Sequence, residues 1–176
     1  MFDTPVQRSE APADTRQGPV RASQPNCLAG MIAVEDILLD VEAATRDGAL
    51  DAIARSIGPR HGLGVQELFA GLARREELGS TALGQGVAIP HARLTGLARA
   101  LVGFVRLRAA VPFAAPDGKP VSSLLVLLVP EQATDAHLEL LAQAANMFCA
   151  KPFRDRLNGC VTAPEVLATL TGWPTG

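Results

Sequence analysis

The stretch LLVLLV (Leu124–Val129) decides the fold class, together with the earlier run ALVGFVRL (Ala100–Leu107). Apolar residues fill almost every position of both runs, whereas a strand with one face in water alternates polar and apolar residues. Continuous apolar strands are typical of a sheet that is covered on both faces. Helical patterns precede and follow the two runs, so we predict an α/β protein: a three-layer α/β/α sandwich with a central mixed sheet flanked by helices.

Periodicity and capping residues place the other elements, with Thr45 and Thr162 as predicted N-caps. The predicted helices are Met31–Leu38, Arg46–Ile57, Val65–Leu78, Asp135–Ala150, Lys151–Leu157 and a last helix that ends near Thr171. Besides the two apolar runs, the predicted strands are Leu39–Ala43 and Val87–Pro90, with a loop at Ser80–Gly86.

Composition divides the chain into two parts. Residues 1–27 are rich in Pro, Ala, Ser, Gln and Arg, and they hold few large apolar side chains. Such a segment cannot bury enough surface to offset the entropy lost on ordering. We therefore predict a disordered tail over residues 1–27 and one domain over residues 28–174.

Charge and apolar content argue against several classes of function. The formal net charge of −2 argues against a nucleic-acid partner, which usually requires a basic patch. No apolar run is long enough to cross a bilayer, and Met1 to Gln24 lack the apolar centre of a signal peptide, so we expect no direct membrane insertion. The three cysteines show no CxxC spacing, which favours a reduced, cytoplasmic protein.

The stretch GSTALGQGVAIPHAR (Gly79–Arg93) contains the candidate functional residue, His91. Pro90 has a fixed φ and biases Ile89 towards an extended conformation, so the imidazole should leave the strand end in a defined direction. A nucleophilic histidine needs one free ring nitrogen, with the proton on the other held by a backbone carbonyl. Ser80, Thr81, loop amides and an arginine could bind a phosphoryl group there. From the residues alone, a half-buried structural histidine is the commoner case.

Motifs for nucleotides, metals and hydrolytic triads are absent from the sequence. Gly84–Gly86 matches neither a P-loop nor a dinucleotide fingerprint, and the two glycines favour a tight turn instead. HExxH, GxSxG and a cluster of acidic residues are missing, so we predict no cofactor and no metal. Any phosphoryl donor should then be another phosphoprotein. We assign His61, in a loop, no role.

Three segments resemble the enzyme IIA domains of the phosphoenolpyruvate-dependent phosphotransferase system, in the fructose/mannitol superfamily. They are RREELGSTALGQGVAIPHARL (Arg74–Leu94), FAAPDGKPV (Phe113–Val121) and LLVLLVPEQATDAHLELLAQAANMF (Leu124–Phe148). The resemblance covers roughly Leu28 to Trp173, and the motifs follow the family's order.

The resemblance implies a role for five residues. His91 matches the histidine that is phosphorylated on Nε2, and His137 matches a second histidine of the active site. Arg75 matches an arginine near the phosphoryl group, and Ser80 and Thr81 match the Ser-Thr pair of the loop. Read without the resemblance, Arg75 is more simply a solvated charge, and His137 is ordinary surface polarity near a helix N-terminus.

One position departs from the family's pattern: Ala92 stands where many relatives have glycine. Alanine resists positive φ, so this residue could alter the local geometry or the transfer rate if the family needs such a conformation. Leu94, Leu83 and Phe113 are expected to form an apolar rim around His91.

The residues before the loop resemble the nitrogen-regulatory branch of the superfamily. This resemblance implies a phosphocarrier that accepts a phosphoryl group from an HPr-like phosphoprotein and regulates target proteins by phosphorylation-dependent binding. Two alternatives stay open: an enzyme IIA component of a sugar permease that passes phosphate to a IIB partner, and an interaction module that has lost phosphotransfer. Whether such a carrier counts as an enzyme is also left open.

Overall fold

The computed structural model describes residues 26–132 and 136–174, and the side chains of Ala136 and His137 lie outside the description. The described residues begin with a 3-10 helix η1 (Cys27–Gly30), β1 (Ile32–Val41), α1 (Arg46–Ile57), a second 3-10 helix η2 (Pro59–His61) and α2 (Val65–Glu77). They continue with β2 (Ala82–Gly84), β3 (Val87–Ala88), β4 (His91–Leu94), β5 (Leu101–Val111) and β6 (Val121–Pro130). They end with α3 (Ala136–Cys149), α4 (Lys151–Gly159) and α5 (Ala163–Gly172).

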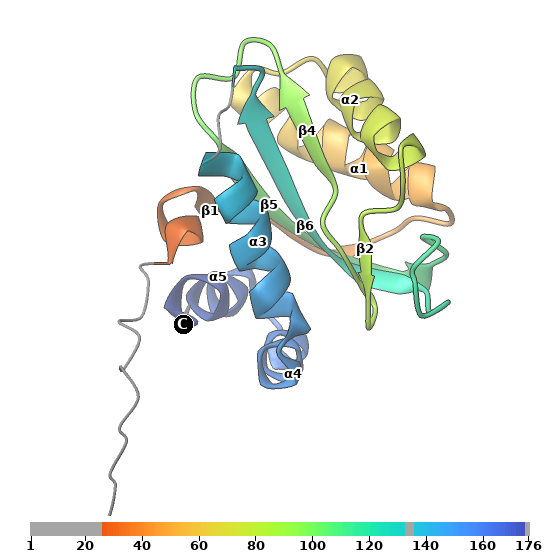
Figure 1. Ribbon diagram of the computed structural model, residues 1–176, viewed down its shortest axis with the longest axis vertical. Coiled ribbons are helices and arrows are strands. Elements are labelled where there is room, and N and C mark those ends of the chain that lie inside the picture. The colour runs from red at the N-terminus through yellow and green to blue at the C-terminus, as the bar shows by residue number, and fades with distance from the viewer. Residues whose placement is uncertain (1–25, 133–135, 175–176) are drawn as a thin grey trace, which may run out of the picture.

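The strands form one mixed sheet of six strands, and helices cover both faces. The order is β1-β5-β6-β3-β2, with β4 also paired to β6. β5 and β6 are antiparallel, whereas β1 is parallel to β5, and both β3 and β4 are parallel to β6. Figure 1 shows α1 and α2 on one face and α3, α4 and α5 on the other. The predicted three-layer sandwich is therefore confirmed.

The apolar run in β6 contributes to both layers of core, which explains its composition. Leu124, Val126 and Leu128 pack in the cluster beneath α1 and α2. Leu125 and Leu127 pack in the cluster beneath α3, α4 and α5. Since alternate positions point to opposite faces of a strand, burial of both faces leaves no place for a polar residue.

The prediction of a helix at Met31–Leu38 is wrong, because all of these residues except Met31 belong to β1. Ile32 pairs with Val102 and Ile37 with Phe104, so the register shifts between them. An irregularity of this kind interrupts the two-residue alternation of a strand, and the remaining apolar spacing then imitates a helix. Most other boundaries agree closely, and α1 begins and ends where the sequence predicts.

The predicted loop at Ser80–Gly86 contains a strand, β2, which turns back into β3 as a hairpin. Gly84, Gln85 and Gly86 all have positive φ, of 86°, 56° and 78°, as a tight turn between strands requires. Asp117 braces this turn by accepting a hydrogen bond from the backbone N–H of Gln85 at 2.8 Å. That hydrogen bond holds the pKa of Asp117 below its usual value.

β3 and β4 run along the same edge of β6 and are separated by Ile89 and Pro90. Pro90 has no N–H, but its carbonyl accepts a hydrogen bond from the N–H of Leu127 at 3.0 Å. The strand resumes at His91, which pairs with Leu127. His91 therefore opens a strand, whereas the sequence placed it just after one.

Residues 1–25 of the predicted tail lie outside the described residues. Asn26 and Cys27, which close that predicted segment, are described. The Asn26 side chain donates to the carbonyl of Leu170 at 2.7 Å and to that of Thr171 at 3.0 Å, which ties it to the end of α5.

At the other end of α5, Thr162 and Glu165 form a capping box, as the sequence predicts for the start of this helix. The N–H groups of Val161 and Thr162 donate to the Glu165 carboxylate and hold its pKa below the usual value. None of the helices in the described residues is both long and apolar enough to span a membrane.

Candidate functional site

The His91 ring is held at both nitrogens. Nδ1 lies 2.9 Å from the carbonyl oxygen of Ile89, and Nε2 lies 2.9 Å from Nε of Arg75. A carbonyl only accepts hydrogen bonds, so Nδ1 carries the proton. Nε2 accepts from the guanidinium and therefore keeps its lone pair. This is the neutral tautomer that the sequence reasoning required, with the Nε2 lone pair directed at a cation.

Arg75 comes from the last turn of α2, across the groove from β4. Its Nη1 donates to the carbonyl of Gly79 at 3.0 Å, while its Nε donates to His91. The guanidinium is thus fixed to the loop after its own helix at one nitrogen, and to the imidazole at another. Arg75 is therefore not simply a solvated charge, because two of its nitrogens hydrogen-bond within the protein.

An open groove of about 670 Å³ contains His91 and Arg75. α2, β4 and α3 supply most of its lining. Leu78 and Leu138 stand at its border with 82% and 57% of their surface exposed. Charged side chains of both signs line it as well: Glu67, Arg74, Arg75, Arg93 and Glu131. The groove combines one nucleophilic nitrogen, several guanidinium groups and exposed apolar side chains.

The expected apolar rim differs in its members. Leu94 lines the groove but is buried, and Phe113 is buried in the core. Leu83 is exposed on β2. Leu78 and Leu138, which the sequence reasoning did not single out, supply the exposed apolar surface instead.

Ser80 and Thr81 both hydrogen-bond within the protein. The Ser80 hydroxyl donates to the carbonyl of Phe113 at 2.5 Å and accepts from the N–H of Ala82 at 3.1 Å. The Thr81 hydroxyl donates to the Glu76 carboxylate at 2.6 Å. Their binding to a phosphoryl group stays a prediction, and both hydroxyls would have to exchange partners to make it.

Glu76 is a further residue at this site that sequence reasoning missed. It follows Arg75 on α2, yet only 3% of its surface is exposed. Its Oε1 accepts from the N–H of Thr81 at 3.0 Å, and its Oε2 accepts from the Thr81 hydroxyl. Charged residues on a helix are normally solvated, so the sequence gives little reason to expect a buried glutamate here. The one signal was Thr81, five positions later, which can hydrogen-bond the carboxylate.

Ala92 lies in β4 and is absent from the residues with positive φ, so its backbone carries no left-handed strain. Its methyl group packs against α2 where Gly71 leaves room: a Cβ added to Gly71 would lie 3.3 Å from that of Ala92. The departure from the family's glycine is therefore accommodated at the contact between the helix of Arg75 and the strand of His91.

His137 falls at the border of the described residues. Its backbone lies in the first turn of α3, in agreement with the predicted helix, and its side chain lies outside the description. Its place at the active site stays a prediction.

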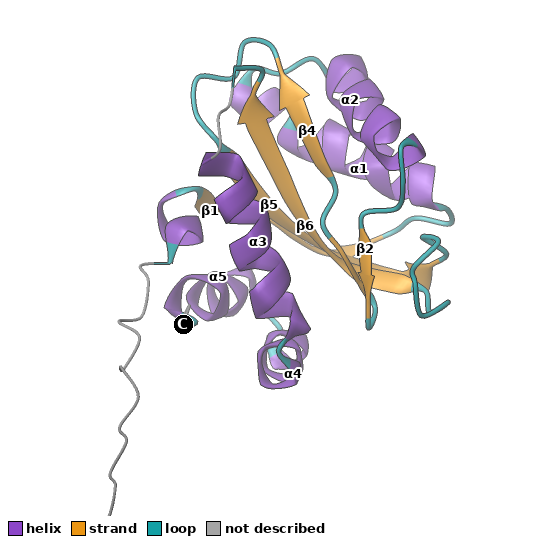
Figure 2. Cartoon of the chain, viewed as in Figure 1, coloured by secondary structure: helices purple, strands orange, loops and turns teal. Residues whose placement is uncertain are grey.

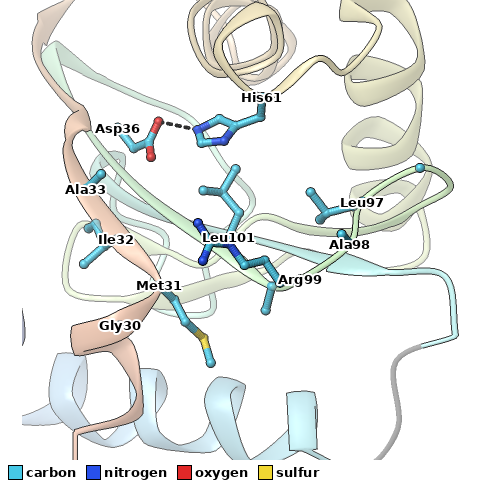
Figure 3. Close-up of a pocket in the computed structure, with 12 residues that line it drawn as sticks. Gly30, Met31, Ile32, Ala33, Asp36, His61, Leu97, Ala98, Arg99 and Leu101 are labelled. Atoms are coloured by element: carbon cyan, nitrogen blue, oxygen red, sulfur yellow. Dashed lines mark hydrogen bonds and ion pairs between the residues drawn. The ribbon is translucent and has the colours of Figure 1, made fainter.

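His61 lies in a second pocket, of about 310 Å³, between β1, η2 and the segment before β5 (Figure 3). Its Nε2 lies 2.8 Å from Oδ1 of Asp36, a carboxylate that is almost completely buried. Beside it, Arg60 donates to the carbonyl of Glu35. The two contacts attach η2 to the irregular part of β1, so the partner that His61 has in the structure is a structural one.

The described residues hold no group of three or more His, Cys, Asp or Glu side chains that could bind a metal ion. Cys27, Cys149 and Cys160 are not joined in disulfides.

Comparison with known proteins gives consistent matches. The family described as "Phosphoenolpyruvate-dependent sugar phosphotransferase system, EIIA 2" matches residues 31–172. A nitrogen regulatory protein of Pseudomonas aeruginosa is 42% identical over 140 residues, which cover 76% of this chain and 91% of that protein. The crystal structure of nitrogen regulatory protein IIA-Ntr from Neisseria meningitidis superposes with a TM-score of 0.78 at 42% identity, covering 82% of this chain and 99% of that one.

A sugar-transport protein is also similar. The 2-O-alpha-mannosyl-D-glycerate-specific EIIABC component of Escherichia coli is 28% identical over 137 residues, which cover 76% of this chain but only 21% of that protein.

Proposed function

We propose a function from one premise: the chain belongs to the EIIA 2 family of the phosphoenolpyruvate-dependent sugar phosphotransferase system. It is a phosphocarrier of the nitrogen-regulatory type. It accepts a phosphoryl group on Nε2 of His91 from an HPr-like phosphoprotein in the cytoplasm, and it regulates target proteins by phosphorylation-dependent binding. The observation that carries the proposal is the tautomer of His91, with Nδ1 committed to Ile89 and the Nε2 lone pair on Arg75.

The transfer is an exchange between two imidazoles. The Nε2 lone pair of His91 attacks the phosphorus of the donor's phosphohistidine, and a new N–P bond forms. The N–P bond of the donor breaks, and its electron pair returns to the donor's ring. Nδ1 of His91 keeps its proton throughout and donates a hydrogen bond to the Ile89 carbonyl, so the neutral nucleophile needs no separate base.

Arg75 supports both states of the histidine. Before transfer its Nε donates to the Nε2 lone pair, so this hydrogen bond must open for attack. Afterwards the guanidinium can donate to the phosphoryl oxygens, where its charge and forked geometry are suited to an anion. Its second contact, on the Gly79 carbonyl, keeps the side chain at the site while the first one changes.

Phosphorylation changes the groove as a binding surface. It adds a charge of about −1.5 to −2 and three acceptor oxygens beside exposed Leu78 and Leu138. A target that packs apolar side chains against the unmodified groove would be repelled. A target with its own arginines would be attracted.

The alternative of a permease component rests on the similarity to the EIIABC protein. In that role the phosphoryl group would pass from His91 to a IIB partner. The alternative of an interaction module without phosphotransfer depends on Ala92 disturbing the local backbone. Ala92 lies in β4 and its φ is not positive, so the structure gives no support to that disturbance. His137, Ser80 and Thr81 keep their proposed places around the phosphoryl group.

The test is a phosphotransfer assay with purified protein, phosphoenolpyruvate, enzyme I and HPr-type carriers from the sugar and nitrogen branches. We expect an acid-labile mass gain of one phosphoryl group, faster with the nitrogen-branch carrier. The variant His91→Ala should gain nothing, while the matched control His61→Ala should gain it normally. Equal labelling of His91→Ala and wild type would overturn the assignment, and faster transfer from the sugar-branch carrier would favour the permease role.

A further inference from the structure

Two neighbouring residues of α2 have different environments. Arg75 reaches into the groove and binds His91. Glu76, the next residue, points into the protein and is buried with its carboxylate on Thr81. A buried carboxylate is costly unless its oxygens are well hydrogen-bonded, so its presence directly behind the arginine calls for an explanation.

Glu76 binds Thr81, the residue that precedes β2. Its N–H and its hydroxyl both donate to the carboxylate, at 3.0 Å and 2.6 Å. Its carbonyl accepts a hydrogen bond from the N–H of Ile89 at 3.0 Å. Thr81 therefore links the end of α2 to the residue whose carbonyl holds Nδ1 of His91. Figure 1 shows the loop in which the chain leaves α2 for β2.

A second path runs from Glu76 to the other ring nitrogen. The contact with Thr81 closes the loop after α2, which contains Gly79. Gly79 has a φ of 148° and no atom within 4 Å of a Cβ built on it, so backbone conformation and not space favours glycine here. The carbonyl of Gly79 holds Arg75, and Arg75 holds Nε2 of His91.

We infer that Glu76 is a positioning residue for phosphoryl transfer: through Thr81 it sets the partners of both ring nitrogens of His91. This inference rests on the proposed function. Glu76 is buried, so it acts through the loop. A shift of the loop would move the Ile89 carbonyl and the Arg75 anchor together, and the nucleophile would lose its tautomer and its cation at once.

The test compares four variants with the wild type. Glu76→Ala removes both contacts. Glu76→Gln preserves them, because the amide oxygen accepts from the Thr81 N–H and the amide nitrogen donates to the hydroxyl, which can also accept. Thr81→Val removes one contact. Thr169→Val is the matched control, since Thr169 is equally buried and bonded through its hydroxyl, but to Cys160 in the opposite layer.

Two measurements are made on each variant. The first is the ¹⁵N NMR spectrum of the His91 ring in the unphosphorylated protein, which reports the tautomer without any donor. The second is the rate of phosphoryl gain from the carrier. We expect Glu76→Ala and Thr81→Val to shift the ring signals and to slow transfer by about tenfold or more, since small misplacements at a reacting centre have large effects. Glu76→Gln should restore both, and Thr169→Val should change only thermal stability.

Unchanged ring signals in Glu76→Ala and Thr81→Val would overturn the inference, even if transfer were slow, because a direct contact of Thr81 with the phosphoryl group could cause the slow rate. If Glu76→Ala does not fold, Thr81→Val and Glu76→Gln decide by the same criteria. A wild type that accepts no phosphoryl group would overturn the proposed function, while the ring signals would still test the positioning.

Discussion

His91 and His61 each bind a charged side chain through Nε2, and the sign of that charge decides what the ring offers. At His61 the partner is the carboxylate of Asp36, 2.8 Å away, so Nε2 must carry a proton to make the contact. At His91 the partner is the guanidinium of Arg75, 2.9 Å away, so Nε2 must present its lone pair. The comparison teaches that placement in a pocket does not make a histidine reactive. We infer that the polarity of its partner decides whether Nε2 is available as a nucleophile, and this difference can be tested by mutation.

The largest effect should come from removing the cation. In Arg75→Ala the Nε2 lone pair loses its donor and the phosphoryl oxygens lose theirs, so we expect transfer to His91 to slow by about 100-fold, the usual cost of one charge-stabilising donor. Rates of phosphoryl gain from the carrier measure this. Arg74→Ala, the adjacent arginine in the same groove, is the control and should slow transfer far less. Equal losses in the two variants would mean that only the total charge matters.

The third histidine sharpens the comparison, because it opens α3, where helix amides favour an anion. We expect His137→Ala to keep the acceptor nitrogen but to slow transfer by about tenfold, because the lost hydrogen bond comes from a neutral donor and contributes about 1 kcal/mol. The same rate assay, with a thermal melt to check folding, measures the effect. A wild-type rate would make His137 an ordinary surface residue.

Breaking the other pair should affect stability and leave the chemistry intact. In Asp36→Asn the amide can still pair with His61, but the charge is lost from a buried contact, and we expect a loss of about 1–3 kcal/mol in the free energy of unfolding. Denaturant melts measure it. Phosphoryl transfer in the same variant should match the wild type, and a slowed transfer would show that the second pocket is coupled to His91.

The smallest effect concerns Ala92. Because its φ is not positive, Ala92→Gly should not improve transfer, and it should cost about 0.5–1 kcal/mol from the greater freedom of glycine in the unfolded chain. Transfer rates and melts on the same sample give both numbers. A clear gain in rate would show that Ala92 impairs transfer, and it would favour the alternative of an interaction module.

The fold could be read from the sequence where the pattern is local. The apolar runs in β5 and β6 required two covered faces, and Thr45 and Thr162 marked helix starts that the structure confirms. β1 was misread because its register shift between Ile32 and Ile37 breaks the alternation on which a strand prediction depends.

The site was predictable to a smaller extent. His91 followed from Pro90, the glycine turn and the resemblance, and its partner carbonyl followed from the chemistry of a neutral nucleophile. The burial of Glu76 did not follow, because it depends on a loop that folds back onto the helix, and no local pattern records that. Hydrogen-bond partners that only the tertiary structure brings together could not be predicted from the sequence.

The doubly anchored loop between α2 and β2 also bears on how a phosphorylated state would be recognised. Ser80 is fixed to the Phe113 carbonyl and Thr81 to Glu76, while Arg75 can change partners by rotating its side chain. We therefore expect the loop backbone to keep its conformation on phosphorylation, with the main change in the charge and the acceptor oxygens at the groove. On that expectation, a protein that distinguishes the two states has to contact the groove itself.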